Sequence, residues 1–133
     1  MIETQFTLYM TNRPGMLAKV TRALALADIN IEGISVSEST DIALVQIVVN
    51  DAAATKKLLD KIRVPFTTQD VALVRLRHKP GSLASLVSRL ARQGVHVNYV
   101  YATGCACKND CHCYAVISSP NLRKVEAMSK SKR

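Results

Sequence analysis

The feature that most constrains the fold of this chain is an internal repeat. The segment NRPGMLAKVTRALALADINIEGISV begins at Asn12, and HKPGSLASLVSRLARQGVHVNYVYA begins 66 positions later at His78; the two align without a gap. The proline, the glycine, two leucines and two alanines are identical at aligned positions of the two copies. Three isoleucines of the first copy align with valines of the second. Such self-similarity indicates one structural unit that occurs twice. We therefore expect two units, residues 1–69 and residues 70–133.

Each copy has the same order of predicted elements. The segments TQFTLYM and VALVRLR alternate apolar and polar residues, as half-buried strands do. An x-Pro-Gly turn, a helix, a second strand, a hairpin and a third strand follow, and Gly94 stands where a helix end favours a left-handed residue. The first unit continues with a helix over about 52–63 and a short strand, VPFTT. The apolar stripes of the two repeat helices are Leu17, Val20, Leu24 and Ala27, and Leu83, Leu86, Val87 and Leu90.

This order predicts an α+β fold made of two ferredoxin-like βαββαβ units in tandem, with the helices on one face of an antiparallel sheet. The second unit ends early, because PNLRKVEAMSKSKR has Leu122 and Val125 for a short helix but no apolar strand. We expect the second unit to lack its last strand. Its first strand would then be an unpaired edge that invites pairing with another chain, so we expect a homodimer. Alternatively, the tail is disordered and the edge is covered in another way.

Composition narrows the functional classes. No apolar run approaches the roughly 18 residues of a membrane span, and the N-terminus lacks the features of a signal peptide. We therefore expect a cytoplasmic protein with no membrane partner. Of the net charge of +8, residues 123–133 carry +4, and we expect this basic tail to be a solvated end. With few aromatic residues and no tryptophan, nucleic-acid binding is not expected.

The sequence shows no catalytic constellation. The three histidines, His78, His96 and His112, are scattered and lie in no motif such as H-E-x-x-H. A cysteine nucleophile would usually need one reactive thiol beside a base, rather than four thiols in one array. We expect the protein not to be an enzyme.

The two copies of the repeat resemble the opening of ACT domains, small βαββαβ regulatory modules that bind amino acids and related metabolites. The chain is similar to stand-alone tandem-ACT proteins with no enzyme attached, and the resemblance is weakest at its C-terminal end. In that family, paired domains share a sheet and the ligand lies where the domains meet. The resemblance implies a non-enzymatic sensor that binds a small ligand, most simply an amino acid.

The physical chemistry of the turn agrees with a ligand site. Backbone N–H groups at the start of a helix lack partners and suit a carboxylate, and glycine allows close approach. By resemblance, the contacting residues are Asn12, Arg13, Pro14, Gly15, Met16, Leu17, Asn30 and Ile31 in the first unit, and His78, Lys79, Pro80, Gly81, Ser82, Leu83 and His96 in the second. His78 and His96 depart from the family pattern, so the second unit binds weakly, binds another ligand, or binds nothing. A purely structural role for both turns is the alternative.

All four cysteines of the chain lie in one segment, CACKNDCHC, residues 105–113. In a regular hairpin centred on Asn109, Cys107 faces Cys111 and Cys105 faces Cys113, so the four thiols project from one face. They could bind one zinc-like or other soft ion such as Cu(I), form two cross-strand disulfides, or act as a reversible dithiol switch. In a cytosolic protein a metal is favoured. A metal sensor or carrier on an ACT scaffold is therefore the second functional hypothesis.

Overall fold

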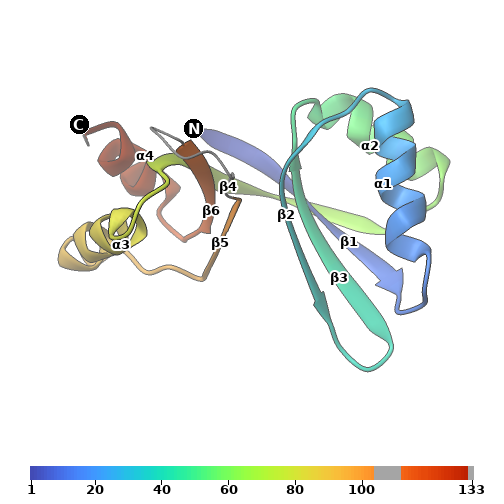
Figure 1. The fold of residues 1–133 in the computed structure, drawn as a ribbon, viewed down its shortest axis with the longest axis horizontal. Helices are drawn as coiled ribbons and strands as arrows, with labels where there is room; N and C mark the ends of the chain where they lie inside the picture. Colours follow the sequence, from blue (N-terminus) through green and yellow to red (C-terminus); the bar gives the residue numbers. More distant parts are fainter. Residues whose placement is uncertain (104–111, 132–133) are drawn as a thin grey trace. The chain divides into compact units, whose positions relative to one another are not determined.

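The computed structural model describes residues 1–103 and 112–131. Its residues form two compact units, Thr4–Gln69 (the N-terminal unit) and Met1–Glu3 with Asp70–Arg133 (the C-terminal unit). The elements in chain order are β1 (Ile2–Thr11), α1 (Met16–Leu26), β2 (Ile31–Glu38), β3 (Ile42–Val49), α2 (Ala52–Lys61), β4 (Phe66–Arg77), α3 (Ser82–Arg92), β5 (Tyr99–Thr103), β6 (His112–Ser118) and α4 (Leu122–Ser131) (Figure 1).

The N-terminal unit has the strand order β2-β3-β1-β4, in which β3 pairs antiparallel with both β2 and β1. The start of β4 lies beside the end of β1, where the Tyr9 N–H donates to the carbonyl of Pro65 at 3.0 Å. Helices α1 and α2 lie on the same side of these strands (Figure 1). The core between helices and strands includes Phe6, Leu8, Val20, Leu24, Val45, Ile47 and Leu59. The unit is an α+β, ferredoxin-like fold with an antiparallel sheet, as predicted.

The C-terminal unit repeats the element order of the other unit, with β4, α3, β5, β6 and α4 in place of β1, α1, β2, β3 and α2. Strand β6 pairs antiparallel with β4 and with β5. Helix α4 lies against α3, where the Arg89 guanidinium donates to the carbonyl of Met128 at 3.0 Å. The core of this unit includes Ala72, Val74, Leu76, Leu86, Leu90, Ile117 and Val125.

The two repeat helices begin and end in closely matched backbone conformations. Gly15 (φ 88°) and Gly81 (φ 91°) precede α1 and α3 in the left-handed region, which glycine adopts readily. Past the helix ends, Gly94 (φ 70°) is left-handed as predicted, and Asp28 (φ 59°) takes this conformation without being glycine. Local backbone geometry therefore agrees with the repeat in the sequence.

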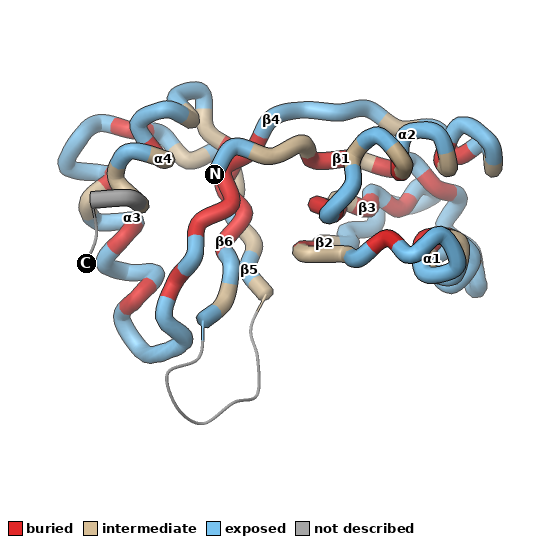
Figure 2. The backbone as a smooth tube through the Cα atoms, turned by 90° about the horizontal axis from the view of Figure 1, so that it is seen from above, coloured by how far each residue is buried: buried red, intermediate tan, exposed pale blue. Residues whose placement is uncertain are grey.

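The predicted apolar stripes are only partly buried. Val20, Leu24, Leu86 and Leu90 are buried, while much of both helices is exposed (Figure 2). Each stripe therefore contains both buried and exposed residues, because a stripe read from spacing is wider than the surface that each helix packs. The more exposed members are Leu17, Ala27, Leu83 and Val87.

Two predictions about the strands and the tail need correction. The segments VPFTT and VALVRLR were expected as separate strands, but β4 begins at Phe66 within the first and runs without a break to the end of the second. The described part of the C-terminal tail is not a solvated, frayed end, because it forms α4, in which Val125 is fully buried. No strand follows α4 among the described residues, yet the first strand of the C-terminal unit is not an unpaired edge.

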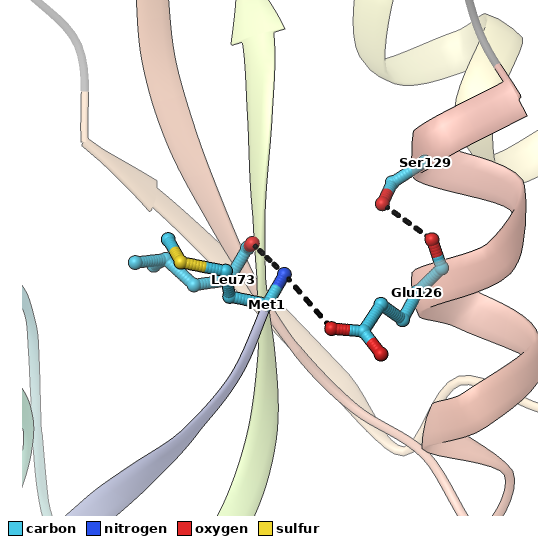
Figure 3. Close-up of polar contacts among 4 residues, drawn as sticks. All are labelled: Met1, Leu73, Glu126 and Ser129. Atoms are coloured by element: carbon cyan, nitrogen blue, oxygen red, sulfur yellow. Dashed lines mark hydrogen bonds and ion pairs between the residues drawn. The ribbon is translucent and has the colours of Figure 1, made fainter.

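Residues at the beginning of the chain lie beside β4 in the C-terminal unit. Met1 and Leu73 exchange two hydrogen bonds: the Leu73 N–H donates to the carbonyl of Met1 at 2.7 Å, and the terminal amine donates to the carbonyl of Leu73 at 3.1 Å (Figure 3). Such an exchange is typical of an antiparallel pair. The amine also lies 3.5 Å from the Glu126 carboxylate on α4 (Figure 3). Met1–Glu3 therefore occupy the place where the missing last strand was expected.

No helix in the described part of the chain is long and apolar enough to span a membrane.

Candidate functional site

The turn before α1 is anchored to the β2–β3 hairpin. The Asn12 N–H donates to the carbonyl of Asp41 at 3.1 Å, and the Asn12 side-chain amide donates to the Glu38 carboxylate at 2.6 Å. Both partners lie within the N-terminal unit, at the end of the hairpin near the turn. The side chain of Asn12 thus already has a protein partner, and its main role in this structure is to fix the turn.

Gly15 leaves the start of α1 open to solvent. No side chain caps this helix, and the space around the position of an added Cβ on Gly15 contains no atom within 4 Å. The Met16 N–H donates to the carbonyl of Arg13 at 3.4 Å. The next N–H groups of a first helical turn have no partners inside the helix, so this uncapped and exposed start offers hydrogen-bond donors and the positive end of the helix dipole. This arrangement can bind a carboxylate.

The structure does not gather all predicted contacts of the N-terminal unit into one cavity. Gly15 lines a cavity of about 320 Å³ along α1, and Met16 lines a different one of about 240 Å³. Asn30 and Ile31 line neither of these cavities. Instead, the Asn30 N–H donates to the side chain of Asn50 at 2.9 Å, and the Asn50 N–H donates back to the carbonyl of Asn30.

In the C-terminal unit, two predicted residues meet in a cavity of about 420 Å³. Sequence reasoning missed most of the other residues in its lining, although alternation in VALVRLR places two arginines on one face of a strand. The lining includes Lys79, Ser82, Arg75, Arg77, His112 and Ser129. The remaining predicted residues, His78, Pro80, Gly81, Leu83 and His96, do not line it.

The lining of this cavity comes from β4, the turn before α3, the first residue of α3, β6 and α4. Arg77 is paired with His112 across β4 and β6, and an Arg75 guanidinium nitrogen lies 3.3 Å from Nδ1 of His112. Lys79 and Ser82 come from the turn and the first residue of α3. The cationic groups therefore lie where β4 ends and α3 begins.

Tyr101 on β5 has a shifted pKa but does not line the cavity. Burial raises the pKa of its phenol, and the neighbouring Tyr99 raises that pKa further. The two rings are stacked with their centroids 6.4 Å apart. The shift reflects packing along β5 and does not mark the candidate site.

Only one of the four cysteines of the predicted metal site lies within the described residues. Cys105, Cys107 and Cys111 lie outside the described residues, and Cys113 is a half-buried free thiol on β6, paired with Leu76. A regular hairpin with Cys105 opposite Cys113 would pair Thr103 with Ala115, but the structure pairs Thr103 with Tyr114. The predicted pairs, Cys105 with Cys113 and Cys107 with Cys111, include residues outside the described ranges, so their register stays a prediction.

Within the described ranges, no group of three His, Cys, Asp or Glu side chains is arranged to bind a metal. Because three of the four cysteines lie outside those ranges, the four-cysteine site stays a prediction.

Comparison with known families identifies the class of the N-terminal unit. The model of the ACT domain family matches residues 4–64, which cover almost all of that unit. The first half of the chain is therefore similar to an ACT domain. No curated protein matches the sequence significantly.

Solved structures match almost the whole chain. Protein BT0572 from Bacteroides thetaiotaomicron matches with a TM-score of 0.85 and 26% identity, covering 98% of this chain and 88% of that one. The ligand-free regulatory subunit of aspartate kinase from Thermus thermophilus matches with a TM-score of 0.72 and 16% identity, covering 98% and 94%. The E. coli aspartokinase III complex with lysine and aspartate has a TM-score of 0.57 and 17% identity, covering 98% and 31%. The last two likenesses concern the fold.

Proposed function

We propose that this protein is a regulatory module of two tandem ACT-type units, which binds a small ligand, most simply an amino acid, and has no catalytic activity of its own. The observation that carries the proposal is the ACT domain at residues 4–64, with its uncapped, exposed helix start at Gly15. The likeness to an aspartate kinase regulatory subunit supports a regulatory role.

The second ACT-type unit is part of the proposal. It is supported by the repeat of the element order and by the matched conformations of Gly15 and Gly81. Homodimer formation is also proposed, by resemblance to the family. The earlier argument from an unpaired sheet edge no longer supports a dimer, because Met1 pairs with Leu73.

The proposed amino-acid site lies at the turn before α1. Main-chain N–H groups after Gly15 would bind the carboxylate, and Arg13, which is exposed beside them, would add a positive charge. The remaining proposed contacts are Asn12, Pro14, Met16, Leu17, Asn30 and Ile31. The corresponding residues of the C-terminal unit, from His78 to Leu83 with His96, stay predictions for a second site.

The repeat provides a matched pair of variants for testing this site. We expect one amino acid in a screen of the twenty to raise the melting temperature of the full chain, because a ligand that binds the folded state stabilises it by RT ln(1 + [L]/Kd). Arg13→Gln should weaken that binding about tenfold, since bonds to charged groups contribute about 1.5–3 kcal/mol. Lys79→Gln, at the equivalent position of the second copy, should not. If no amino acid at millimolar concentration shifts the transition, the proposed ligand class is wrong.

We also propose that the cysteine segment binds one zinc-like or other soft metal ion through Cys105, Cys107, Cys111 and Cys113. Four thiols within one short segment support this, as does the free thiol of Cys113. Metal analysis and thiol titration of protein purified under reducing conditions test it. We expect one bound ion, lost in Cys105→Ser; no stoichiometric metal together with four freely titrating thiols would contradict the proposal.

A further inference from the structure

The N-terminal unit contains a cavity of about 240 Å³ between the end of β1, the first turns of α1 and the turn that follows α2. At about 30 Å³ for each water molecule, this volume equals that of roughly eight waters, which is enough for a small metabolite. All of the lining residues belong to this one unit.

One part of the lining is apolar. Met10, Val20 and Val64 line the cavity and are buried in the core of the unit. Met16 and Ile62 also line it, and they pack against the same core while remaining partly exposed. Methionine is flexible and polarizable, so it adapts to an apolar molecule beside it. This wall favours a ligand with a hydrocarbon group, because covering it removes apolar surface from water.

The other part of the lining is cationic. Lys19 and Arg63 both line the cavity, and none of the described residues in its lining is acidic. Both side chains are exposed, and neither has a hydrogen-bond or ion-pair partner in the described part of the chain. Lys19 also lines the cavity along α1. Two such charges favour an anion, and a guanidinium matches the two oxygens of a carboxylate.

The repeat and the backbone indicate that the fold does not need these two charges. In the second copy, Ser85 stands at the position of Lys19, and α3 forms there without a charge. Arg63 has a left-handed backbone with φ 60°, which glycine adopts more readily than arginine does. The formation of the helix and of the turn therefore does not account for a cation at either position.

Main-chain hydrogen bonds hold the turn after α2 in place. The Val64 N–H donates to the carbonyl of Leu59 at 3.0 Å, and the Tyr9 N–H on β1 donates to the carbonyl of Pro65 at 3.0 Å. The turn is thus tied both to α2 and to β1. A cavity whose walls are already ordered loses less conformational entropy when a ligand binds.

We propose that this cavity binds a small apolar monocarboxylate, a short branched-chain acid without an ammonium group. Its hydrocarbon tail lies against the apolar wall, and its carboxylate lies beside Lys19 and Arg63. An amino acid fits less well, because its ammonium group would enter a lining with two cations and, among the described residues, no acid. Neither cation is among the contacts proposed for the amino acid, so this site does not depend on that one.

Calorimetric titration of the full chain with 4-methylpentanoate, at constant ionic strength, tests the proposal. We expect saturable binding that Lys19→Gln and Arg63→Gln each weaken about tenfold, as the loss of one hydrogen bond to a charged group typically does. Arg22→Gln and Lys61→Gln remove exposed positive charges from α1 and α2 outside this lining, and they should leave the affinity unchanged. Circular dichroism checks that each variant is folded.

Three further ligands test the chemistry of the site. We expect 4-methylpentanamide, which lacks the charge, acetate, which lacks the tail, and leucine, which adds an ammonium group, each to bind this cavity about tenfold more weakly. The proposal is overturned if 4-methylpentanoate does not saturate, if Arg22→Gln or Lys61→Gln weakens its binding as much as Arg63→Gln does, or if acetate or the amide binds as tightly. It is also overturned if Arg63→Gln weakens the binding of leucine as much as that of 4-methylpentanoate.

The variant Arg13→Gln separates this site from the proposed amino-acid site. It should leave the affinity for 4-methylpentanoate unchanged, whereas it should weaken the binding of the amino acid. Loss of 4-methylpentanoate binding in Arg13→Gln, with no loss in Arg63→Gln, would place the acid at the turn before α1 and contradict the proposal.

Discussion

The backbone at the ends of the repeat helices shows how single residues fix the fold. Gly94 and Asp28 stand at equivalent positions, and both have a left-handed φ. An added Cβ on Gly94 would meet no atom within 4 Å, so the only cost of a side chain there is the left-handed backbone itself. We expect Gly94→Ala to lower the free energy of unfolding by about 1–2 kcal/mol. Urea denaturation measures this, and an unchanged midpoint would show that the turn relaxes freely.

The buried hydroxyl of Ser82, which has no hydrogen-bond partner among the described residues, leads to the opposite expectation for stability. Ser82→Ala removes an unpaired polar group, so the free energy of unfolding should rise by about 1 kcal/mol. Ser88→Ala, at an exposed position of the same helix, corrects for the better helix propensity of alanine. Chemical denaturation tests this, and a loss of stability beyond that of the control would mean that the hydroxyl has a partner in the protein.

The residues that line the cavity of about 420 Å³ in the C-terminal unit were only partly predictable from the sequence. Lys79 and Ser82 were expected because they flank Pro80 and Gly81 of the turn, whereas Arg75 and Arg77 looked like ordinary polar positions of a half-buried strand. Alternation shows that the two arginines share a face, but it cannot show that the start of α3 and His112 lie beside them. His112 lies beside them because β4 pairs with β6, which joins residues far apart in the sequence.

At the scale of elements, α2 illustrates a helix whose start is fixed by one side chain. The carboxylate of Asp51 accepts a hydrogen bond from the N–H of Ala54 at 3.0 Å, which satisfies one of the unpaired donors of the first turn. We expect Asp51→Ala to lower the free energy of unfolding by about 1 kcal/mol, and Asp51→Asn to lower it much less, because asparagine is also a good cap. Thermal denaturation compares the two variants. Equal losses of stability would mean that the charge of Asp51, rather than its capping hydrogen bond, stabilises the helix.

Helices were more predictable than strands, for a physical reason. The start and end of α1 and α3 depend on local signals, a Pro-Gly turn and a left-handed residue, that the sequence displays directly. The sequence of β4 contains a misleading signal. The polar pair Gln69 and Asp70 suggests a strand boundary, but the strand continues through both residues. Strands are held by distant partners, so a polar pair within one does not have to end it.

At the scale of the whole molecule, the beginning of the chain stabilises residues more than seventy positions away. Because Met1 and Leu73 exchange two hydrogen bonds, removal of residues 1–3 should expose the Leu73 N–H and lower the melting temperature. Hydrogen exchange measures this: we expect faster exchange at Leu73 and little change at Leu8 in the N-terminal unit. Unchanged exchange at Leu73 would contradict the pairing. No sequence pattern in residues 1–3 predicted it, since three residues are too few to show a period.

The assignment of Met1–Glu3 to the C-terminal unit has a topological consequence. The N-terminal unit, Thr4–Gln69, is inserted into the sequence of the C-terminal unit, whose chain leaves after Glu3 and returns at Asp70. Because the residues at these two crossing points belong to neighbouring antiparallel segments, they are separated by little more than the width of a turn. A two-residue Asn-Gly link could therefore replace the whole insertion and close a β-hairpin. The discontinuous unit could then be obtained as one short continuous chain, whereas a cut at residue 70 would separate it from Met1–Glu3, which lie beside its strand β4.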